Sequence, residues 1–386
     1  MNRAPVIAGL GITEMGKVYG RGAPEFAADA VRRAATDAGL DPHDVDGLLT
    51  NTGITGDVGL SLQRDLGLRH LRLLSEVQAY GSSAGAMVQY AAMAVSSGMA
   101  DVVACVFADA PLKDRSMGGG AAYAGARALT GWQGMAAASG IYSANSMYAL
   151  AARRHMATYG TTSEQLGHIA VAQRAWAARN PLAQMRTPIT LEDHQSSRWI
   201  AEPFHLLDCC LVSNGGVAVI VTSADRAADL AQPAVHIRGW GQAHPGYVMG
   251  KDSEFGLVSG AALSGPTALK KAGITIADID VAELYDCYTY TALISLEDYG
   301  FCAKGEGGPF VASGVLGPEG SLAVNTGGGQ LSSYYMWGMT PLSEAVIQAR
   351  GQGGDRQAPR NDMVLVSGNG GVLDHHSTLI LSPHAR

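Results

Sequence analysis

The stretch Glu283–Phe301, ELYDCYTYTALISLEDYGF, opens like a buried strand and continues like a helix, with Tyr285 at the polar turn between them. A second polar turn, Asn325–Met339 (NTGGGQLSSYYMWGM), contains Tyr335, and a third turn is Gly81-Ser82-Ser83. We expect the rest of the chain to form the scaffold that brings these three turns to one cleft.

The residues leading into this stretch repeat an earlier part of the chain. Both copies read helix, Ala-Gly, four residues, Asp-(Val/Ile)-Asp and strand. The first copy runs from the helix Pro24–Ala38 to the strand Gly47–Thr52, and the second from Pro266–Ala272 to Val281–Leu284. An internal duplication explains this repeat. It predicts an α/β fold of two similar layered halves, with helices on both faces of mixed sheets.

Apolar runs and helical spacing predict further elements on either side of an insertion. The predicted strands are Ala4–Ile12, Leu74–Tyr80, Val102–Ala108, Val217–Thr222 and Met363–Val366, and the predicted helices are Ala86–Ser97, Ser143–Tyr159, Ser163–Asn180 and Pro341–Arg350. Residues 109–198 break the strand–helix rhythm, so we interpret them as an inserted loop or lid over the cleft. The N-terminal half is then residues 1–108 plus 199–225, and the C-terminal half is residues 226–386.

Composition and charge argue against several classes of protein. The 386 residues exceed the length at which single hydrophobic cores stop growing, which fits two halves. The net charge of −7 argues against a nucleic-acid partner, and no uncharged apolar run is long enough to predict a membrane span. The five cysteines include no CxxC pair, so neither a disulfide framework nor a metal site is indicated. The N-terminus lacks a signal-peptide pattern, and we expect a cytoplasmic protein.

Three segments resemble the thiolase superfamily, in its lipid-transfer or sterol-carrier-type branch. They are AELYDCYTYTALISLEDYGFCAKGEGG, the NTGGGQLS…GM…EAV…QARG run, and SGNGGVLDHHSTLILS. The resemblance covers nearly the whole chain. It implies the duplicated, layered thiolase-like fold, an insertion over the active-site cleft, and a homodimer with the strand Leu74–Tyr80 at its interface.

The departures from the thiolase pattern concern its reactive groups. A thiolase carries a nucleophilic cysteine at the turn where this chain has Gly81, followed by two serines. The histidine of the sterol-carrier-type HDCF motif corresponds to Tyr285, and the histidine that follows the NxxGG turn corresponds to Tyr335, with Tyr334 as a rival one residue away. The sequence therefore argues against Claisen chemistry through an acyl-cysteine.

This tyrosine pair resembles that of the bacterial steroid side-chain-cleaving aldolases of the same branch. The resemblance implies retro-aldol cleavage of a β-hydroxyacyl-CoA thioester to a ketone and a short acyl-CoA such as propionyl-CoA. One tyrosine would act as base and the other as acid, and Tyr285 and Tyr335 are both open to either role. Because the ordinary pKa of tyrosine is about 10, the base needs groups that stabilise its anion.

The resemblance also implies what the protein binds. Coenzyme A enters as part of the substrate, and no separate cofactor is expected. The implied partner is a separate OB-fold/zinc-ribbon protein, because this chain has no zinc-ribbon cysteines. The partner is fused to a hydratase, associated with one, or stands alone.

Further candidate site residues come from the same three turns and from a glycine turn near the C-terminus. Asp286 and His375 are candidate catalytic residues, and either His375 or His376 should face the cleft if that segment is extended. The candidate substrate- or CoA-binding residues are Ser82, Ser83, Asn325, Gly328, Gly370 and Gly371.

Each candidate has a structural alternative. The tyrosines can be core aromatics, the serines can cap a helix or form a small-residue turn, and Cys287 and Cys302 can be buried small apolar residues. Two other functions stay open on the sequence alone. One is an acetyl-CoA acyltransferase (thiolase) that uses another nucleophile, and the other is a lipid- or acyl-CoA-binding subunit without chemistry of its own.

Overall fold

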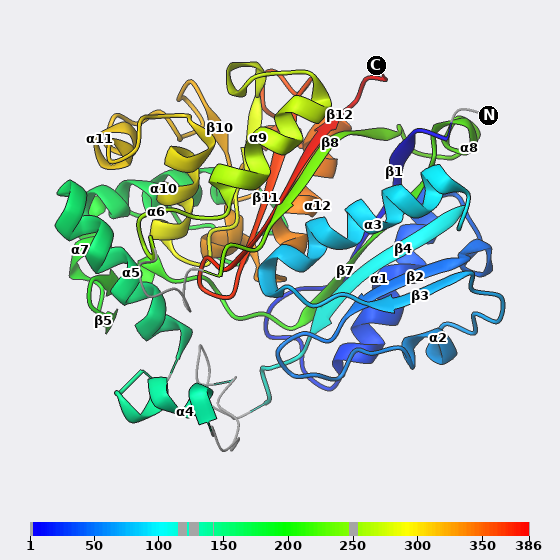
Figure 1. The fold of residues 1–386 in the computed structure, drawn as a ribbon, viewed down its shortest axis with the longest axis horizontal. Coiled ribbons are helices and arrows are strands. Elements are labelled where there is room, and N and C mark those ends of the chain that lie inside the picture. The colour runs from blue at the N-terminus through cyan, green and yellow to red at the C-terminus, as the bar shows by residue number, and fades with distance from the viewer. Residues whose placement is uncertain (1–2, 115–121, 123–130, 142, 247–253, 386) are drawn as a thin grey trace.

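A single mixed sheet of ten strands forms the centre of the molecule (Figure 1). The computed structural model describes residues 3–114, 122, 131–141, 143–246 and 254–385. The strands of the sheet are β1 (Pro5–Ile12), β2 (Gly47–Asn51), β3 (Leu73–Glu76), β4 (Val102–Asp109), β7 (Gly215–Ser223), β8 (Val235–Ala243), β9 (Val281–Glu283), β10 (Ala323–Val324), β11 (Val364–Gly370) and β12 (His375–Ser382). A separate hairpin pairs β5 (Trp199–Ala201) with β6 (Phe204–His205).

The strand order shows the internal duplication directly. Outward from the centre, the order β1-β7-β4-β2-β3 on one side matches β8-β12-β11-β9-β10 on the other. In both halves the inner strands pair antiparallel and the outer three pair parallel. The halves join where Val6 and Ile7 of β1 pair with His236 and Val235 of β8. The predicted two-halved α/β fold is thus present as one continuous sheet.

Helices cover both faces of the sheet, and two of them contact both of its halves. The helices of the described residues are α1 (Ala23–Ala38), α2 (Leu62–Asp65), α3 (Ser83–Ser97), α4 (Gly131–Ala138), α5 (Ala144–Tyr159), α6 (Ser163–Ala178), α7 (Leu191–Ser196), α8 (Ala224–Ala227), α9 (Ala261–Ala272), α10 (Thr289–Tyr299), α11 (Gly307–Ala312) and α12 (Met339–Ala349). Helices α3 and α12 contact each other and strands of both halves, so they form the inner layer (Figure 1). Helix α1 packs on the first half from outside, and α9 packs on the second.

The repeated acidic residues explain why the two copies fold alike. The carboxylate of Asp46 accepts hydrogen bonds from the backbone N–H groups of Asp101 and Val102, where β4 begins. Asp280 accepts one from the N–H of Met363, just before β11. The second aspartate of each Asp-(Val/Ile)-Asp motif therefore fixes the start of the next strand of its half.

Glycines in the innermost strands let the outer helices approach closely. A β-carbon at Gly9 of β1 would lie 2.2 Å from the carbonyl oxygen of Ala34 in α1. A β-carbon at Gly239 of β8 would lie 2.2 Å from the carbonyl oxygen of Ala268 in α9. Both contacts require glycine, and they occupy matching places in the two halves.

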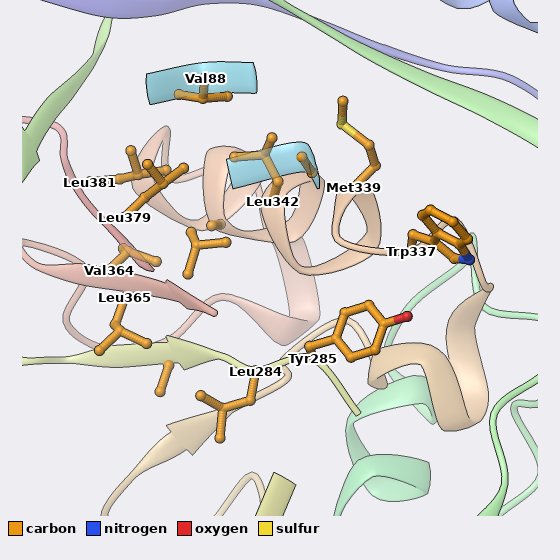
Figure 2. Close-up of a cluster of buried hydrophobic side chains, with 14 of the residues drawn as sticks. Val88, Leu284, Tyr285, Trp337, Met339, Leu342, Val364, Leu365, Leu379 and Leu381 are labelled. Atoms are coloured by element: carbon orange, nitrogen blue, oxygen red, sulfur yellow. The ribbon is translucent and has the colours of Figure 1, made fainter. Parts of the chain in front are cut away.

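The apolar core leads from the inner helices towards one end of the central strands. Figure 2 shows Val88 of α3 and Leu342 of α12 on the same side of β11 as Leu379 and Leu381 of β12. The same cluster ends at Tyr285 and Trp337, which are both buried. The core thus continues without a break into the walls of the site described below.

The predicted strand Leu74–Tyr80 is shorter in the structure. β3 ends at Glu76, and residues 80–82 form a 3₁₀ turn. The side chain of Asn51 donates to the carbonyl oxygen of Val77, and Ser83 Oγ accepts from the N–H of Ala79. These side chains satisfy backbone groups that a longer strand would pair. α3 also starts earlier than predicted, at Ser83.

Of the inserted residues, those of α6 lie against the C-terminal half. Helix α6 packs against α10, α11 and the π-helical turn Gly329–Ser333, and α5 and α7 lie on the same side of the molecule (Figure 1). Among the described helices, none combines the length and apolar character needed to cross a bilayer.

Candidate active site

One cavity of about 600 Å³ lies where the three polar turns meet. Of the residues predicted for the site, it is lined by Gly81, Tyr285, Tyr335, Gly370, Gly371 and His375. The turn after β3, the turn after β9 and the turn before α12 all contribute to it, as does the β11–β12 hairpin. The structure therefore brings together turns that are far apart in the sequence.

The two tyrosines contact each other through their hydroxyl groups. Tyr285 Oη and Tyr335 Oη lie 3.2 Å apart, a hydrogen-bond distance, and both side chains face the cavity. Tyr334, the rival for the second role, points elsewhere: its ring is buried and its hydroxyl bonds Ser343 Oγ at 2.6 Å. Of these two adjacent tyrosines, Tyr335 is therefore the one whose side chain lines the cavity.

Asp286 holds the two tyrosine turns together from behind. Its carboxylate is fully buried and accepts hydrogen bonds from the backbone N–H groups of Gln330 and Leu331. Burial raises its pKa to about 7, against the opposing effect of these donors. The carboxylate does not line the cavity. Its place in the structure is that of a brace between the turns of Tyr285 and Tyr335.

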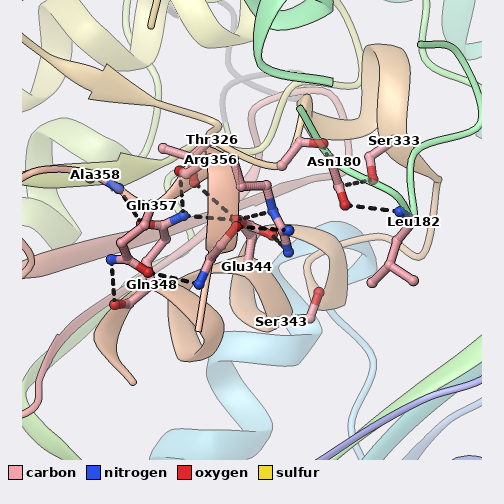
Figure 3. A network of polar contacts seen from close by, with 12 residues as sticks. Asn180, Leu182, Thr326, Ser333, Ser343, Glu344, Gln348, Arg356, Gln357 and Ala358 are labelled. Carbon is pink, nitrogen blue, oxygen red and sulfur yellow. Dashed lines mark hydrogen bonds and ion pairs between the residues drawn. The ribbon is translucent and has the colours of Figure 1, made fainter. Parts of the chain in front are cut away.

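A buried polar network supports the turn that precedes Tyr335 (Figure 3). Thr326 Oγ1 donates to Glu283 and Glu344, and Arg356 forms an ion pair with Glu344 at 2.9 Å. Burial and the charge of Glu344 raise the pKa of Glu283 well above its usual range. Asn180 of the insertion donates to the carbonyl oxygen of Gly327 at 2.8 Å. The network makes this turn a rigid platform.

Gly81 and the ring of Tyr285 lie so close together that a side chain at position 81 would overlap the ring. A β-carbon at position 81 would lie 2.3 Å from the ring of Tyr285 and 2.2 Å from the carbonyl oxygen of Asn369. No side chain fits at Gly81 while Tyr285 keeps its place. Position 81 is where the resemblance to thiolases puts the nucleophilic cysteine, so the tyrosine ring fills the space that the cysteine would need.

Four of the predicted binding residues lie outside the cavity. Ser82 Oγ donates to the carbonyl oxygen of Ala79, and Ser83 Oγ accepts hydrogen bonds from the N–H of Ala79 and the amide of Asn51. Asn325 Oδ1 accepts from the N–H of Leu284 at 2.6 Å.

Gly328, the fourth of these residues, has φ of 95° and packs against Ala177 of α6. Like the two serines and Asn325, it shapes a turn. The sequence marks all four as turn residues but does not show which way each side chain faces.

The two adjacent histidines face opposite sides of β12. His375 lies at the cavity wall, stacked on Tyr80 with ring centroids 5.9 Å apart and with Nδ1 3.0 Å from Nδ1 of His244. Burial and the neighbouring His244 lower its pKa. His376 is buried behind the strand, 3.0 Å from the hydroxyl of Tyr299, and burial lowers its pKa to about 3. Alternation along an extended strand accounts for the difference.

Aromatic residues that sequence reasoning did not assign to the site form much of its wall. Tyr80, Trp337, Tyr148 and Tyr288 line the cavity, and Trp337 stacks on Phe107 at 5.0 Å. Tyr80 and Trp337 have positive φ values of 50° and 48°, a strained conformation that is common at functional sites. Trp337 lies within the second polar turn, so a large aromatic residue in a predicted site turn is the feature of the sequence that could have indicated it.

Cys210 and Cys287 line the cavity but are held as thiols. Burial raises the pKa of Cys287 to about 12 and that of Cys210 well above its usual range. A thiolate nucleophile is therefore disfavoured at both positions. Within the described part of the chain, no group of three or more His, Cys, Asp or Glu side chains is arranged to hold a metal ion.

Comparisons with known proteins agree with this fold. Residues 241–383 match the family model "Thiolase C-terminal domain-like". The chain is 41% identical over 377 residues to a steroid side-chain-cleaving aldolase of Thermomonospora curvata, covering 95% of each chain. It is 40% identical over 374 residues to a 17-hydroxy-3-oxo-4-pregnene-20-carboxyl-CoA lyase of Mycobacterium tuberculosis, covering 94% of this chain and 96% of the relative.

The solved structure of an Ltp2-ChsH2(DUF35) aldolase superposes with a TM-score of 0.87 at 40% identity, covering 99% of this chain and 98% of the other. The chain belongs to the thiolase superfamily, in the lipid-transfer and sterol-carrier-type branch that includes these aldolases. It is a carbon–carbon lyase of the aldolase type. The resemblance and the fold class predicted from the sequence are confirmed.

Proposed function

We propose that the protein cleaves a β-hydroxyacyl-CoA thioester by a retro-aldol reaction, giving a ketone and a short acyl-CoA such as propionyl-CoA. The observation that carries the proposal is the pair of tyrosine hydroxyls, 3.2 Å apart, facing a cavity of about 600 Å³. This volume is typical of ligand sites, and its aromatic walls suit a bulky apolar acyl group such as a steroid side-chain intermediate. The named activities of the similar proteins support the same substrate class.

The tyrosines supply the two proton transfers that the reaction needs. One phenolate removes the proton from the β-hydroxyl oxygen, the Cα–Cβ bond breaks, and the ketone forms as electrons move to the thioester enolate. The other tyrosine donates a proton to Cα of the enolate, which completes the acyl-CoA product. A proton then passes from the first tyrosine to the second across the 3.2 Å between their hydroxyl oxygens, which restores both groups for the next cycle, and no acyl-enzyme forms. The turn at Gly370 and Gly371 lets backbone N–H groups approach the thioester oxygen.

The proposal includes two partners. A second copy of the chain would pair along β3, and the position of β3 at the edge of the sheet supports this homodimer. A separate OB-fold/zinc-ribbon protein would complete the active complex. Support for such a partner comes from the similar Ltp2-ChsH2(DUF35) aldolase structure.

Incubation with a tertiary β-hydroxyacyl-CoA, with and without the partner protein, tests the function. We expect a ketone and propionyl-CoA in equal amounts, identified by mass spectrometry. Acyl exchange that consumes free coenzyme A, without a ketone product, would instead favour the acyltransferase. Binding of the thioester without turnover in either mixture would favour the non-catalytic alternative.

A further inference from the structure

The insertion contributes one hydroxyl group to the cavity wall. Ala144, Met147 and Tyr148 of α5 line the cavity, and of these three only Tyr148 carries a hydroxyl. Its side chain is buried, and its ring packs on Tyr288 with centroids 4.8 Å apart. Tyr148 therefore stands in the same cavity as the tyrosine pair but comes from a different part of the chain.

Tyr148 accepts one hydrogen bond and has a weak acceptor as a neighbour. Asn369 Nδ2 donates to Tyr148 Oη at 3.3 Å, so the oxygen is the acceptor in that bond. Cys287 lines the same cavity and interacts electrostatically with Tyr148. Because sulfur accepts hydrogen bonds weakly, a stronger acceptor that enters the cavity can take the hydrogen bond that Tyr148 donates.

Two further observations favour a donor role over a proton-transfer role. Burial raises the pKa of Tyr148 well above its usual range, so the hydroxyl keeps its proton. The bond from Asn369 polarises the hydroxyl and strengthens it as a donor. Asn369 is itself 1% exposed.

We infer that Tyr148 donates a hydrogen bond to the carbonyl oxygen of the thioester and stabilises the enolate that carbon–carbon cleavage leaves on that oxygen. This inference rests on the proposed function. Negative charge develops on the thioester oxygen as the Cα–Cβ bond breaks, and a fixed donor in a water-poor site stabilises that charge most in the transition state. Tyr148 thus has a role separate from the proton transfers of Tyr285 and Tyr335.

Kinetics of Tyr148→Phe test the role during turnover. The variant keeps the ring and its packing on Tyr288, so we expect the melting temperature to change little. Loss of one such donor typically lowers kcat by about 10²–10³-fold, and we expect KM to change much less. Tyr290→Phe is the matched control, because Tyr290 is a buried tyrosine outside the cavity whose hydroxyl donates to the carbonyl oxygen of Gly256.

Binding of two matched ligands tests the same contact without catalysis. Propionyl-CoA has the thioester carbonyl, whereas the thioether S-propyl-CoA lacks that oxygen. We expect the preference for the thioester to be roughly fivefold larger in the wild-type protein than in Tyr148→Phe, as the loss of one hydrogen bond predicts, because the backbone donors at Gly370 and Gly371 remain in the variant. Isothermal titration calorimetry on the full chain, with its partner where one is required, measures both dissociation constants.

The two readouts separate the inference from the proposed function. If the wild-type protein cleaves no β-hydroxyacyl-CoA but prefers the thioester through Tyr148, the proposed reaction is wrong and the thioester contact stands. If Tyr148→Phe keeps the wild-type preference, the contact is wrong, whatever the kinetics show. If the preference is lost while kcat is unchanged, Tyr148 binds the thioester but does not stabilise the enolate.

Discussion

The hydroxyl oxygens of Tyr285 and Tyr335 lie 3.2 Å apart, although the residues are 50 positions apart in the chain. Asp286, next to the first tyrosine, accepts hydrogen bonds from the backbone of Gln330 in the segment before the second. The hydrogen bonds of Asp286 and the contact between the two tyrosine hydroxyls therefore join the same two turns. It sets the geometry of the two hydroxyls before any ligand arrives, as general acid–base catalysis requires.

Removing either hydroxyl should abolish most of the activity without unfolding the protein. Tyr285→Phe and Tyr335→Phe each keep the ring but lose the group that transfers a proton. We expect kcat to fall by at least about 10²-fold in each variant, because general acid–base catalysis contributes about 10²–10⁴-fold. Steady-state kinetics and thermal melting of the purified variants provide the measurement.

Two other tyrosines are controls for this pair. Tyr334→Phe removes a buried hydroxyl that bonds Ser343 outside the cavity, and we expect near-normal kcat. Tyr288→Phe removes a hydroxyl that donates to Asn145, and we expect a much smaller loss than for Tyr285. Near-wild-type kcat in both Tyr285→Phe and Tyr335→Phe would show that the pair only packs.

A methyl group at position 81 should disable the site. Gly81→Ala places a β-carbon 2.3 Å from the ring of Tyr285 and 2.2 Å from the carbonyl oxygen of Asn369, so both the ring and that backbone must move. We expect a stability loss of about 1–3 kcal/mol from overpacking and a fall in kcat of about 10²-fold from the displaced hydroxyl. The control is Gly317→Ala, whose β-carbon meets nothing closer than 3.9 Å. Full activity in Gly81→Ala would contradict the claim that a side chain at position 81 displaces the ring of Tyr285.

The cavity cysteines should be dispensable and slow to alkylate. With its pKa raised to about 12, Cys287 has a thiolate fraction on the order of 10⁻⁴ at pH 8. We expect iodoacetamide to label it far more slowly than a free thiol, and Cys210→Ala to keep kcat within about threefold because no acyl-enzyme forms. Rapid inactivation with the label on one cysteine would instead indicate a covalent intermediate.

His376 should make the protein less stable in acid. Its pKa falls from 6.5 to about 3 on folding, so the unfolded chain binds a proton that the folded chain excludes. Stability should therefore fall as pH drops from about 6.5 towards 3, by up to about 1.4 kcal/mol per pH unit from this group. Denaturant unfolding of His376→Gln at several pH values should show a shallower slope.

The control for this slope is His70→Gln, which replaces an exposed histidine and should leave it unchanged. His376→Gln should also lose stability at neutral pH, because His376 lies within hydrogen-bond distance of Tyr299 and Ser367. An identical pH slope in His376→Gln and the wild-type chain would rule out this histidine as the source.

The sequence allowed prediction of features that depend on local pattern. The Asp-(Val/Ile)-Asp repeat marked the duplication because its second aspartate starts a strand in both halves. Tyr285 and Tyr335 could be found because each replaces a reactive residue at a recognisable turn. Tyr148 could not, since its place in the cavity depends on how a helix of the insertion packs on the C-terminal half.

The misplaced candidates have a common physical reason. Ser82 and Ser83 bond backbone groups of their own turn, and Asp286 bonds backbone groups of the neighbouring turn. Sequence position identifies a turn and does not say which of its polar groups point inwards. The strand is shorter than the predicted Leu74–Tyr80 because the side chain of Asn51 bonds the carbonyl oxygen of Val77, although the N–H of Val77 still pairs with Thr50.

The exclusion between Gly81 and Tyr285 has a consequence for how such a chain can change its chemistry. A cysteine at position 81 and a tyrosine at position 285 cannot both occupy this arrangement, since a β-carbon at the first would meet the ring of the second. A variant that carries one replacement without the other either has a crowded site or has neither reactive group. A β-carbon at position 81 would also lie 2.2 Å from the carbonyl oxygen of Asn369. Any stepwise route between a cysteine-dependent and a tyrosine-dependent enzyme on this scaffold therefore passes through an impaired intermediate, unless the backbone at Asn369 moves away first.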